Sequence, residues 1–286
     1  SDAFAGRDPG TEGFNLAANY VESFLSKNRI LPFFNNNYKD SVVVNGKVSY
    51  NIVGLIGERN PNNKHILIGA HLDHLGISTE EERNEAEKSD SILTTSQIAS
   101  DSIYNGANDN ASGVTAVLQI AQQLRKYNFE QNIIIALFTG EEIDFIGSRH
   151  LAEKLKSDSV NLSFMLNFEM IGKTLSTGEN QVFLTGSSKS NCAEEMNKIV
   201  DRTFVSFSQA YLDSGLFYYS DNYPFFEEFQ VPCHTIVSFD FDNYDHYHKV
   251  SDEIIQLDVE NMNSIIHSST FIISQLLKNN IELINH

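Results

Sequence analysis

The chain has 286 residues, of which 41% are hydrophobic and 20% are charged, so it has the composition of a globular protein that can bury a large core. Its formal net charge of -18 argues against nucleic acid as a partner, because no basic stripe is present to neutralise phosphates. The same charge disfavours anionic membrane surfaces, and no window reaches the roughly 18 uninterrupted apolar residues that a membrane span needs. We therefore expect neither nucleic-acid binding nor membrane insertion.

Helical and strand-like patterns alternate along the chain. Apolar residues at helical spacing predict a first helix over 11–28, and the turn dipeptide Asn45-Gly46 predicts a hairpin formed by the stretches 41–50 and 51–58. Further along, the patterns predict strands at 65–70, 133–138, 162–167, 181–185, 204–208 and 231–237, and helices at 111–127, 145–156, 191–203, 221–228 and 257–279.

This alternation favours one α/β layer sandwich around a largely parallel sheet. No internal repeat and no linker rich in glycine, serine or proline divides the chain, so we expect a single domain over 1–286. An acidic insertion at about 76–104 has few apolar residues, and a stretch of this length is unusual unless it has a function. Two interpretations of the insertion stay open: a lid over a site and a passive surface loop.

Two cysteines, Cys192 and Cys233, are too few for a disulfide framework, and whether they pair is left open. Cys233 lies in a strand-like stretch, which favours a buried thiol. The sequence starts with neither a secretory signal nor a methionine, so we expect a trimmed form from which a targeting segment is absent.

Glu141 and Glu142 follow the apolar stretch 133–138 after a short turn. Carboxylates at the carboxyl end of a buried strand lie where open α/β sheets place their active sites, yet adjacent negative charges repel and are costly to desolvate. A metal cation removes this conflict if one glutamate coordinates it and the other stays free as a base. A solvated acidic turn is the alternative, but it does not explain the position after a buried strand.

Other residue types that bind metals stand at strand ends and in loops. Residues two apart face the same side of an extended chain, so Asp73 could accept the proton of the His71 nitrogen that is not on the metal. Asp109 stands where a loop becomes a helix, where a short carboxylate could either bridge two cations or cap the helix. Glu169 repeats the strand-end pattern. For His71 and Asp73, the alternative is a solvated histidine beside an aspartate that binds no metal.

Tyr247 and His248 precede the last predicted helix. The Tyr247 phenol could donate a hydrogen bond to a developing oxyanion, or it could serve only in packing. Imidazoles and carboxylates together are the ligand types that suit zinc. The sequence therefore predicts a zinc site built from strand ends that lie far apart along the chain.

These motifs together resemble the co-catalytic zinc aminopeptidases, typified by the single-domain bacterial leucine aminopeptidase and Streptomyces aminopeptidase and related to glutamate carboxypeptidase and glutaminyl cyclase. The resemblance spans nearly the whole chain. It is carried by Ala5-Gly6-Arg7, Gly10-Thr11, Gly69-Ala70-His71-Leu72-Asp73-His74, Gly106-Ala107-Asn108-Asp109-Asn110-Ala111-Ser112-Gly113, Thr139-Gly140-Glu141-Glu142, Gly147-Ser148, Asn167-Phe168-Glu169-Met170-Ile171-Gly172, Ser220-Asp221, Pro224-Phe225, Tyr247-His248 and Asp252.

The resemblance implies a three-layer α/β sandwich with a mixed, mostly parallel eight-stranded sheet. It also implies two Zn²⁺ ions, exchangeable with other divalent metals, that share a bridging carboxylate. The first ion would be held by His71, Asp109 and Glu169, and the second by Asp109, Glu142 and His248. Glu141 would be the general base and acid, Tyr247 the oxyanion donor, and Asp73 the support of His71. The chain departs from the family at Glu169, which is often aspartate, and at Asn222, which is usually histidine.

The implied activity is that of an aminopeptidase, which removes N-terminal residues from peptides with a free N-terminus through a metal-bridged water. A glutaminyl-cyclase-like acyltransferase with one zinc and a non-catalytic binding module on the same scaffold are the alternatives. The resemblance also implies an exported protein, whether periplasmic, lipid-anchored or secreted. The oligomeric state and the preferred terminal residue are left open. The candidates for an apolar substrate pocket are Met170, Phe217, Tyr218, Tyr219 and Phe225.

Overall fold

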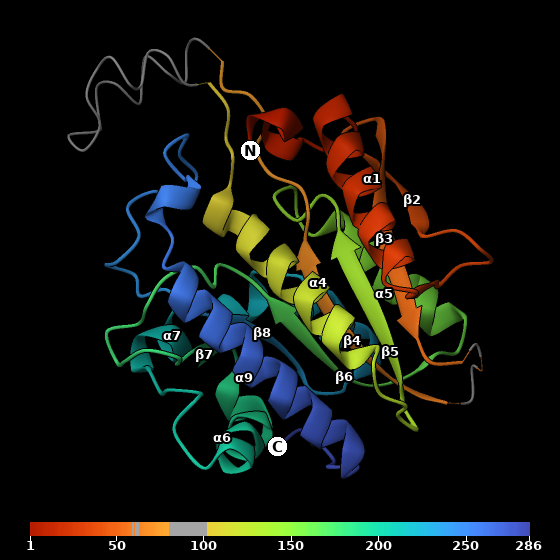
Figure 1. The fold of residues 1–286 in the computed structure, drawn as a ribbon, viewed down its shortest axis with the longest axis vertical. Coiled ribbons are helices and arrows are strands. Elements are labelled where there is room, and N and C mark those ends of the chain that lie inside the picture. Colours follow the sequence, from red (N-terminus) through yellow and green to blue (C-terminus); the bar gives the residue numbers. More distant parts are fainter. Residues whose placement is uncertain (59, 61–62, 80–101) are drawn as a thin grey trace.

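The computed structural model describes residues 1–58, 60, 63–79 and 102–286, and the strands among them form one eight-stranded mixed sheet (Figure 1). The strands are β1 (Leu31–Pro32), β2 (Lys39–Val44), β3 (Lys47–Ile56), β4 (Lys64–His71), β5 (Asn132–Phe138), β6 (Asn161–Phe168), β7 (Phe183–Leu184) and β8 (Cys233–Val237). Their order is β1-β3-β5-β4-β6-β8-β7, with β2 paired to β3. The expected mixed sheet is confirmed, but it is less parallel than expected, with three parallel and four antiparallel strand pairings. Parallel pairing is confined to the central run of β5, β4, β6 and β8, and the outer strands are antiparallel to their neighbours.

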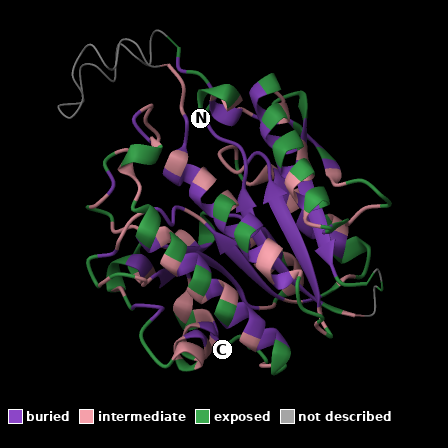
Figure 2. Ribbon diagram, in the orientation of Figure 1, coloured by how far each residue is buried: buried purple, intermediate pink, exposed green. Residues whose placement is uncertain are grey.

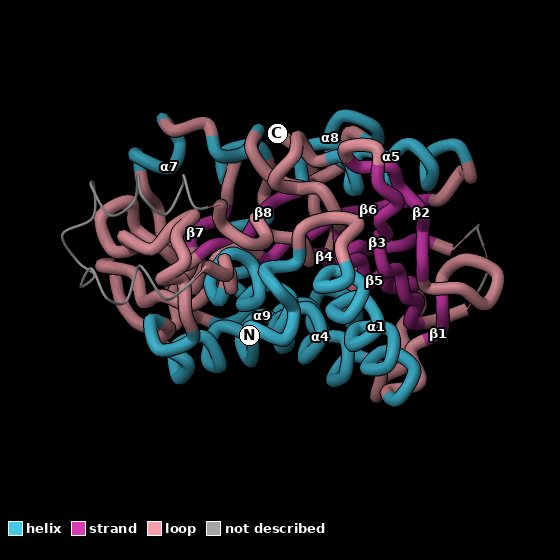
Figure 3. Tube along the Cα trace, turned by 90° about the horizontal axis from the view of Figure 1, so that it is seen from above, coloured by secondary structure: helices cyan, strands magenta, loops and turns pink. Residues whose placement is uncertain are grey.

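Helices cover both faces of the sheet, which gives the expected three layers (Figure 3). The α-helices are α1 (Glu12–Lys27), α4 (Gly113–Leu124), α5 (Ile146–Ser157), α6 (Cys192–Val200), α7 (Gln209–Asp213), α8 (Asn222–Phe229) and α9 (Val259–Lys278). On one face α4 packs between α1 and α9, and on the other α5 packs against α8.

The central strands read as continuous apolar runs because both of their faces are covered. All 7 residues of β5 are buried, and only the first residue of β4 is exposed. Figure 2 shows the same contrast, with a buried sheet and exposed outer faces on the helices. One apolar cluster fills the space under α1, α4 and α9, and a second fills the space under α5 and α8.

Most predicted elements are present, with shifted ends. The hairpin turns at Asn45-Gly46, as predicted, but β3 runs without a break through the expected boundary between 50 and 51. The predicted strand at 181–185 shrinks to β7, and the one predicted at 204–208 is absent except for one bridge between Val182 and Val205. There, the Asn197 side chain accepts hydrogen bonds from the main chain of 204–205, so a side chain takes the place of a neighbouring strand.

Cys192 in α6 and Cys233 in β8 are both buried and free, so they do not pair. Burial raises the pKa of the Cys192 thiol to about 12, and it raises the pKa of Cys233 as well. A buried thiol of this kind behaves as a small apolar side chain.

The acidic insertion predicted at about 76–104 lies mostly outside the described residues, and only its two ends can be placed. Ile77 and Ile103 form an antiparallel bridge. The N–H of Ser78 donates to the carbonyl of Ser102 at 2.7 Å, and the N–H of Tyr104 donates to the carbonyl of Gly76 at 3.0 Å. The insertion therefore leaves and re-enters the fold at one place. Among the described helices, none combines the length and hydrophobicity of a membrane span.

A buried histidine in β8 predicts how stability depends on pH. His234 Nε2 is 2.7 Å from the Ser190 hydroxyl, and Nδ1 is 2.8 Å from the Thr185 carbonyl oxygen. Burial lowers the pKa of His234 to about 4. The unfolded chain takes up this proton near pH 6.5 and the folded chain does not, so stability should fall by about 3 kcal/mol as the pH drops from 6.5 to 4.

His234→Asn keeps a donor for the Thr185 carbonyl and removes the titrating group. Urea unfolding at several pH values between 4 and 7 should show the stability advantage of the wild type over this variant shrinking by about 3 kcal/mol toward low pH. A stability difference that stays constant over this range would contradict the assignment.

Candidate metal centre

The strand register brings the predicted site residues to one edge of the sheet. In the β4–β5 pairing His71 lies opposite Phe138, so the 141–142 pair follows just beyond that level. In the β4–β6 pairing Gly69 lies opposite Asn167, which places His71 at about the level of Glu169. Because these strands are parallel, their carboxyl ends meet at the same edge, where α/β folds build their sites.

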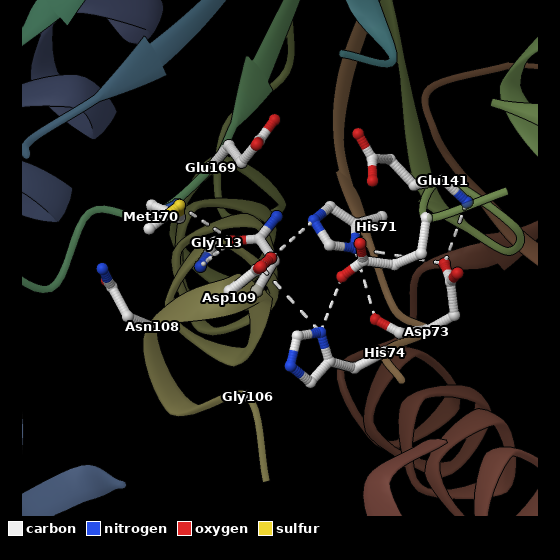
Figure 4. Close-up of polar contacts among 12 residues, drawn as sticks. His71, Asp73, His74, Gly106, Asn108, Asp109, Gly113, Glu141, Glu169 and Met170 are labelled. Carbon is white, nitrogen blue, oxygen red and sulfur yellow. Dashed lines mark hydrogen bonds and ion pairs between the residues drawn. The ribbon is translucent and has the colours of Figure 1, made fainter. Parts of the chain in front are cut away.

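His71, Asp109, Glu142 and His248 converge on one point (Figure 4 draws the first two from β4 and the 106–113 loop). Asp109 Oδ1 is 3.2 Å from His71 Nε2, and Asp109 Oδ2 is 3.2 Å from His248 Nε2. His248 Nε2 is also 3.0 Å from Glu142 Oε2. Asp109 therefore lies between the two imidazoles, the position that the sequence predicts for a bridging carboxylate.

In Figure 4 Glu169 and Asp109 are drawn on one side of His71, and Glu141 is drawn on the other. His71, Glu141 and Glu169 each offer a ligand atom within 4.8 Å of the other two, and so do His71, Asp109 and Glu142. The Glu169 carboxylate accepts a hydrogen bond from the Ser220 hydroxyl. The structure therefore brings all five predicted ligands to one cluster, but it groups Glu169 with Glu141 rather than with Asp109.

The loop that carries Asp109 is held from several directions. The neighbouring Asn108 accepts a hydrogen bond from Gly172 N–H at 2.8 Å, and Asn110 donates to the carbonyl of Phe168 at 2.9 Å. Asp252 accepts the N–H of Asn108 at 2.8 Å and that of Asp109 at 3.0 Å. The alternative of a helix N-cap is not realised, because the helix α4 begins only at Gly113 and Asp109 has non-helical angles.

Asp73 supports His71 in a different way from the one predicted. His71 Nδ1 is 3.3 Å from the Asp73 main-chain carbonyl and 4.0 Å from its carboxylate. The carboxylate instead accepts the N–H of Glu141 at 3.3 Å. The reason is local: β4 ends at His71, so the extended geometry behind the prediction does not continue to Asp73. Asp73 therefore links the His71 segment to the Glu141 segment.

His74 belongs to the cluster, although no pattern in the sequence predicts a role for it. Its Nδ1 is 2.6 Å from Glu142 Oε1, and its ring lies 5.9 Å from that of His248. It is buried, and Figure 4 shows it beneath Asp109. Its spacing from His71 does not predict a shared site, because residues three apart in a strand face opposite sides of the sheet. Only the turn after β4 brings His74 back to Glu142.

Tyr247 lies at the edge of the cluster and is 52% exposed, so a substrate can reach it. Its ring stacks on that of His248 with centroids 3.9 Å apart. Of the candidates for the apolar pocket, Phe225 is fully buried against Phe138, where it is part of the core. Tyr218 and Tyr219 are exposed.

Asn222, which stands where the family usually has histidine, has a structural role. Its amide donates to the carbonyl of Phe217 at 3.0 Å, and its oxygen accepts the Thr235 hydroxyl at 2.8 Å. It therefore ties the start of α8 to β8.

The carboxylates and imidazoles shift one another's pKa values. Burial alone would raise the pKa of Asp109, but the imidazoles of His248 and His71 beside its carboxylate hold it well below its ordinary range. Burial opposes protonation of His248, yet Asp109 and Glu142 raise its pKa to about 10. Burial raises the pKa of Glu169 to about 7 and that of Glu141 well above its usual value. The centre therefore favours positive charge among its carboxylates.

The side chains present fit a metal cation. His71 Nε2, His248 Nε2 and Asp109 Oδ2 are buried atoms without a hydrogen-bond partner among the described residues. His71 Nε2 lies 3.2 Å from Asp109 Oδ1, and His248 Nε2 lies 3.2 Å from Asp109 Oδ2, so both imidazoles face the same carboxylate. Buried polar atoms are rarely left unpaired, and an imidazole–carboxylate set is a zinc-type donor set. His71, Asp109, Glu142 and His248 would hold the metal, and Glu169 offers a further carboxylate near His71.

Comparison with known proteins gives short matches in sequence and long ones in structure. A probable zinc metalloprotease of Pyrenophora tritici-repentis is 40% identical over 74 residues, which is 26% of this chain and 15% of that protein. The probable lipoprotein aminopeptidase LpqL of Mycobacterium tuberculosis is 43% identical over 68 residues, 23% of this chain and 14% of that protein. The matched part thus spans only about 15% of the length of such curated relatives.

Two solved structures share the fold over nearly the whole chain. The LapA aminopeptidase of Legionella pneumophila has a TM-score of 0.72 at 19% identity, with 96% of this chain and 68% of that chain covered. A glutaminyl cyclase of Porphyromonas gingivalis has a TM-score of 0.69 at 16% identity, with 95% and 93% covered. The model of peptidase family M28 matches residues 51–270, which include every predicted metal ligand. This protein is therefore a member of peptidase family M28.

Proposed function

We propose that this protein is an aminopeptidase that uses two zinc ions. The observation that carries the proposal is the position of Asp109, whose two oxygens each lie 3.2 Å from a different imidazole, that of His71 and that of His248. A carboxylate with both oxygens engaged in this way suits a bridge between two cations. Glu142 would complete one ligand set and Glu169 the other.

Glu141 is the general base and acid of the proposed reaction. Zinc, when bound, supplies the polarisation of water and of the scissile carbonyl. The Glu141 carboxylate takes the proton from the attacking water and passes it to the nitrogen of the leaving amine. Glu141 is only partly buried, so water and substrate can reach it. The loss of most of its solvent raises its pKa and so favours proton uptake.

Tyr247 and Asp73 assist this chemistry. The exposed Tyr247 hydroxyl donates a hydrogen bond to the oxygen on which negative charge develops. The Asp73 carboxylate holds the main chain of Glu141, and its carbonyl orients the His71 ring. A substrate α-ammonium group would be attracted by the surrounding carboxylates, which favours cleavage at a free N-terminus.

The experiment compares leucine 4-nitroanilide with its N-acetyl form, each with and without a chelator. We expect the free amine to be cleaved faster by a factor of at least about 10², because the acetyl form lacks the charge that the carboxylates would pair. We also expect the chelator to stop both reactions. Cleavage of both forms at equal rates would contradict exopeptidase action. Conversion of N-terminal glutamine to pyroglutamate without cleavage of leucine 4-nitroanilide would identify a cyclase. No turnover of any of these substrates would support a non-catalytic binding module.

Two further proposals concern the whole chain. The single sheet with both faces covered supports a single zinc-peptidase domain over 1–286. The relative named as a lipoprotein aminopeptidase supports an exported protein, whether periplasmic, lipid-anchored or secreted. Fractionation of the native cells with an antibody to this chain would test the second proposal, and recovery from the cytoplasm alone would contradict it.

A further inference from the structure

Arg7 is a buried cation beside the carboxylate cluster, and it lies outside residues 51–270, which match the family model. Its guanidinium donates three hydrogen bonds, all to main-chain carbonyls. Nε binds Leu72 at 2.8 Å, Nη1 binds Asn105 at 2.7 Å, and Nη2 binds Gly106 at 3.2 Å. Leu72 directly follows the proposed ligand His71, and Gly106 opens the loop that carries Asp109. One side chain therefore joins the two ligand-bearing loops.

The main chain around Arg7 tightens the same junction. The carbonyl of Arg7 accepts the N–H of His74 at 3.2 Å, and the carbonyl of Gly6 accepts that of Gly76 at 2.9 Å. A Cβ on Gly106 would lie 2.8 Å from Arg7 Nη2 and 2.5 Å from the His74 ring, so only glycine fits between them. Close packing therefore joins three segments here: the N-terminal segment, the segment after β4 and the loop that carries Asp109.

The Arg7 charge acts on the carboxylates without pairing directly with one of them. Among the described residues, no carboxylate oxygen lies within 4.0 Å of its guanidinium. Its hydrogen bonds go to neutral carbonyls, while Asp109 and Asp73 are the carboxylates whose charges act on it most strongly. Buried charges repel strongly in a site of low dielectric constant. A fixed cation here offsets part of the repulsion among the carboxylates that gather at the metal centre.

We propose that Arg7 is a positioning residue for the metal centre, which holds the His71 and Asp109 segments at the separation that zinc binding requires. The inference rests on the metal site of the proposed function. The alternative is that Arg7 only anchors the N-terminal segment to the fold. An anchor would affect the temperature of unfolding but leave the intrinsic affinity for zinc unchanged.

Two variants separate these roles. Arg7→Met removes the charge and all three hydrogen bonds, and Arg7→Lys keeps the charge but loses the planar fork that reaches three carbonyls. The control is Arg202→Met, which removes a similar set of hydrogen bonds from an exposed arginine. Arg202 donates to the carbonyls of Asn180 and Thr203 and to the Ser268 hydroxyl, none of which belongs to the metal centre.

Zinc affinity is measured by competition with a chromogenic chelator, zinc content by mass spectrometry, and metal-free stability by thermal unfolding. We expect Arg7→Met to bind zinc about 10–100-fold more weakly than the wild type, the range typical of residues that support metal ligands. Arg7→Lys should recover part of this loss. Arg202→Met should bind zinc like the wild type, even if it unfolds at a lower temperature.

Wild-type affinity in both Arg7 variants would overturn the proposal, whatever their unfolding temperatures. If a variant does not fold without metal, the zinc concentration at half-maximal folding takes the place of the chelator assay. Because lower folding stability alone also raises this concentration, it is compared with that of a core variant of similar stability loss, Leu25→Ala. An increase about 10-fold or more beyond this control supports the proposal, and an equal value overturns it. If the wild type binds zinc and the variants match it, only the role of Arg7 fails. If the wild type binds no zinc, the proposed function fails and the role of Arg7 fails with it.

Discussion

Replacing Glu141 with glutamine should lower peptide turnover by a factor on the order of 10²–10⁴ while zinc stays bound. Glutamine keeps the length and shape of the side chain, but its amide cannot take a proton from water or return one to the leaving amine. Rates on leucine 4-nitroanilide and zinc content by mass spectrometry, measured on the same preparation, give the result. Near-normal turnover would show that Glu141 is not the base.

The same variant decides between two roles that the structure allows for Glu141. Its carboxylate lies within 4.8 Å of ligand atoms on His71 and Glu169, so a metal held by these three is a real alternative. Loss of one zinc from Glu141→Gln would identify it as a ligand. Glu142→Gln should lose zinc, because Glu142 contacts His248 at 3.0 Å. Glu227→Gln, which alters a surface pair with Arg149, should keep both zinc and activity.

Replacing Asp109 with asparagine should abolish activity and release both zinc ions. The amide keeps the shape of the carboxylate, but it removes the negative charge that lies between His71 and His248. The loss of affinity should exceed the roughly 10–100-fold seen for residues that only support ligands. Asp258→Asn at the start of α9 is the control, and it should bind zinc normally. Retention of two zinc ions by Asp109→Asn would refute the bridge.

Zinc binding should also strengthen as the pH rises. In the metal-free protein the carboxylates raise the pKa of His248 to about 10, and they raise that of His71 well above its ordinary value. Each bound zinc must displace such protons, so affinity should fall by up to about 10-fold per pH unit for each proton released as the pH is lowered. Proton release on adding zinc in weakly buffered solution measures the number directly. Binding without proton release would contradict this linkage.

Several members of the site follow from local pattern. Glu142 and Glu169 come after apolar strands, and parallel pairing carries such strand ends to one edge regardless of detail. Ligand chemistry then selects His71 and His248, because few other side chains suit zinc beside carboxylates. Asp109 was open to two interpretations in the sequence. Its contact with both imidazoles favours the bridge over the helix cap.

Other members could not be found in this way. His74 and Arg7 reach the centre only because the chain turns sharply after β4 and packs against the N-terminal segment. Strand geometry predicts the Asp73 carboxylate as the partner of His71, but the main-chain carbonyl of Asp73 is the nearer group, because β4 ends at His71. Asp252 holds the Asp109 main chain from 143 positions away, a distance that no spacing rule covers.

Sequence patterns alone predict the order of strands and helices along the chain, the strand ends on which ligands stand, and the chemical type of those ligands. These properties depend on apolar periodicity and on side-chain chemistry, which are local. Only the folded chain shows which side chains meet: Glu169 lies near His71 and Glu141, and Asp109 lies between His71 and His248. It also shows that Arg7 joins the loops. Distances of a few ångströms between remote residues depend on strand register and on the close packing of turns. Both depend on several segments of the chain at once, so no single segment predicts them.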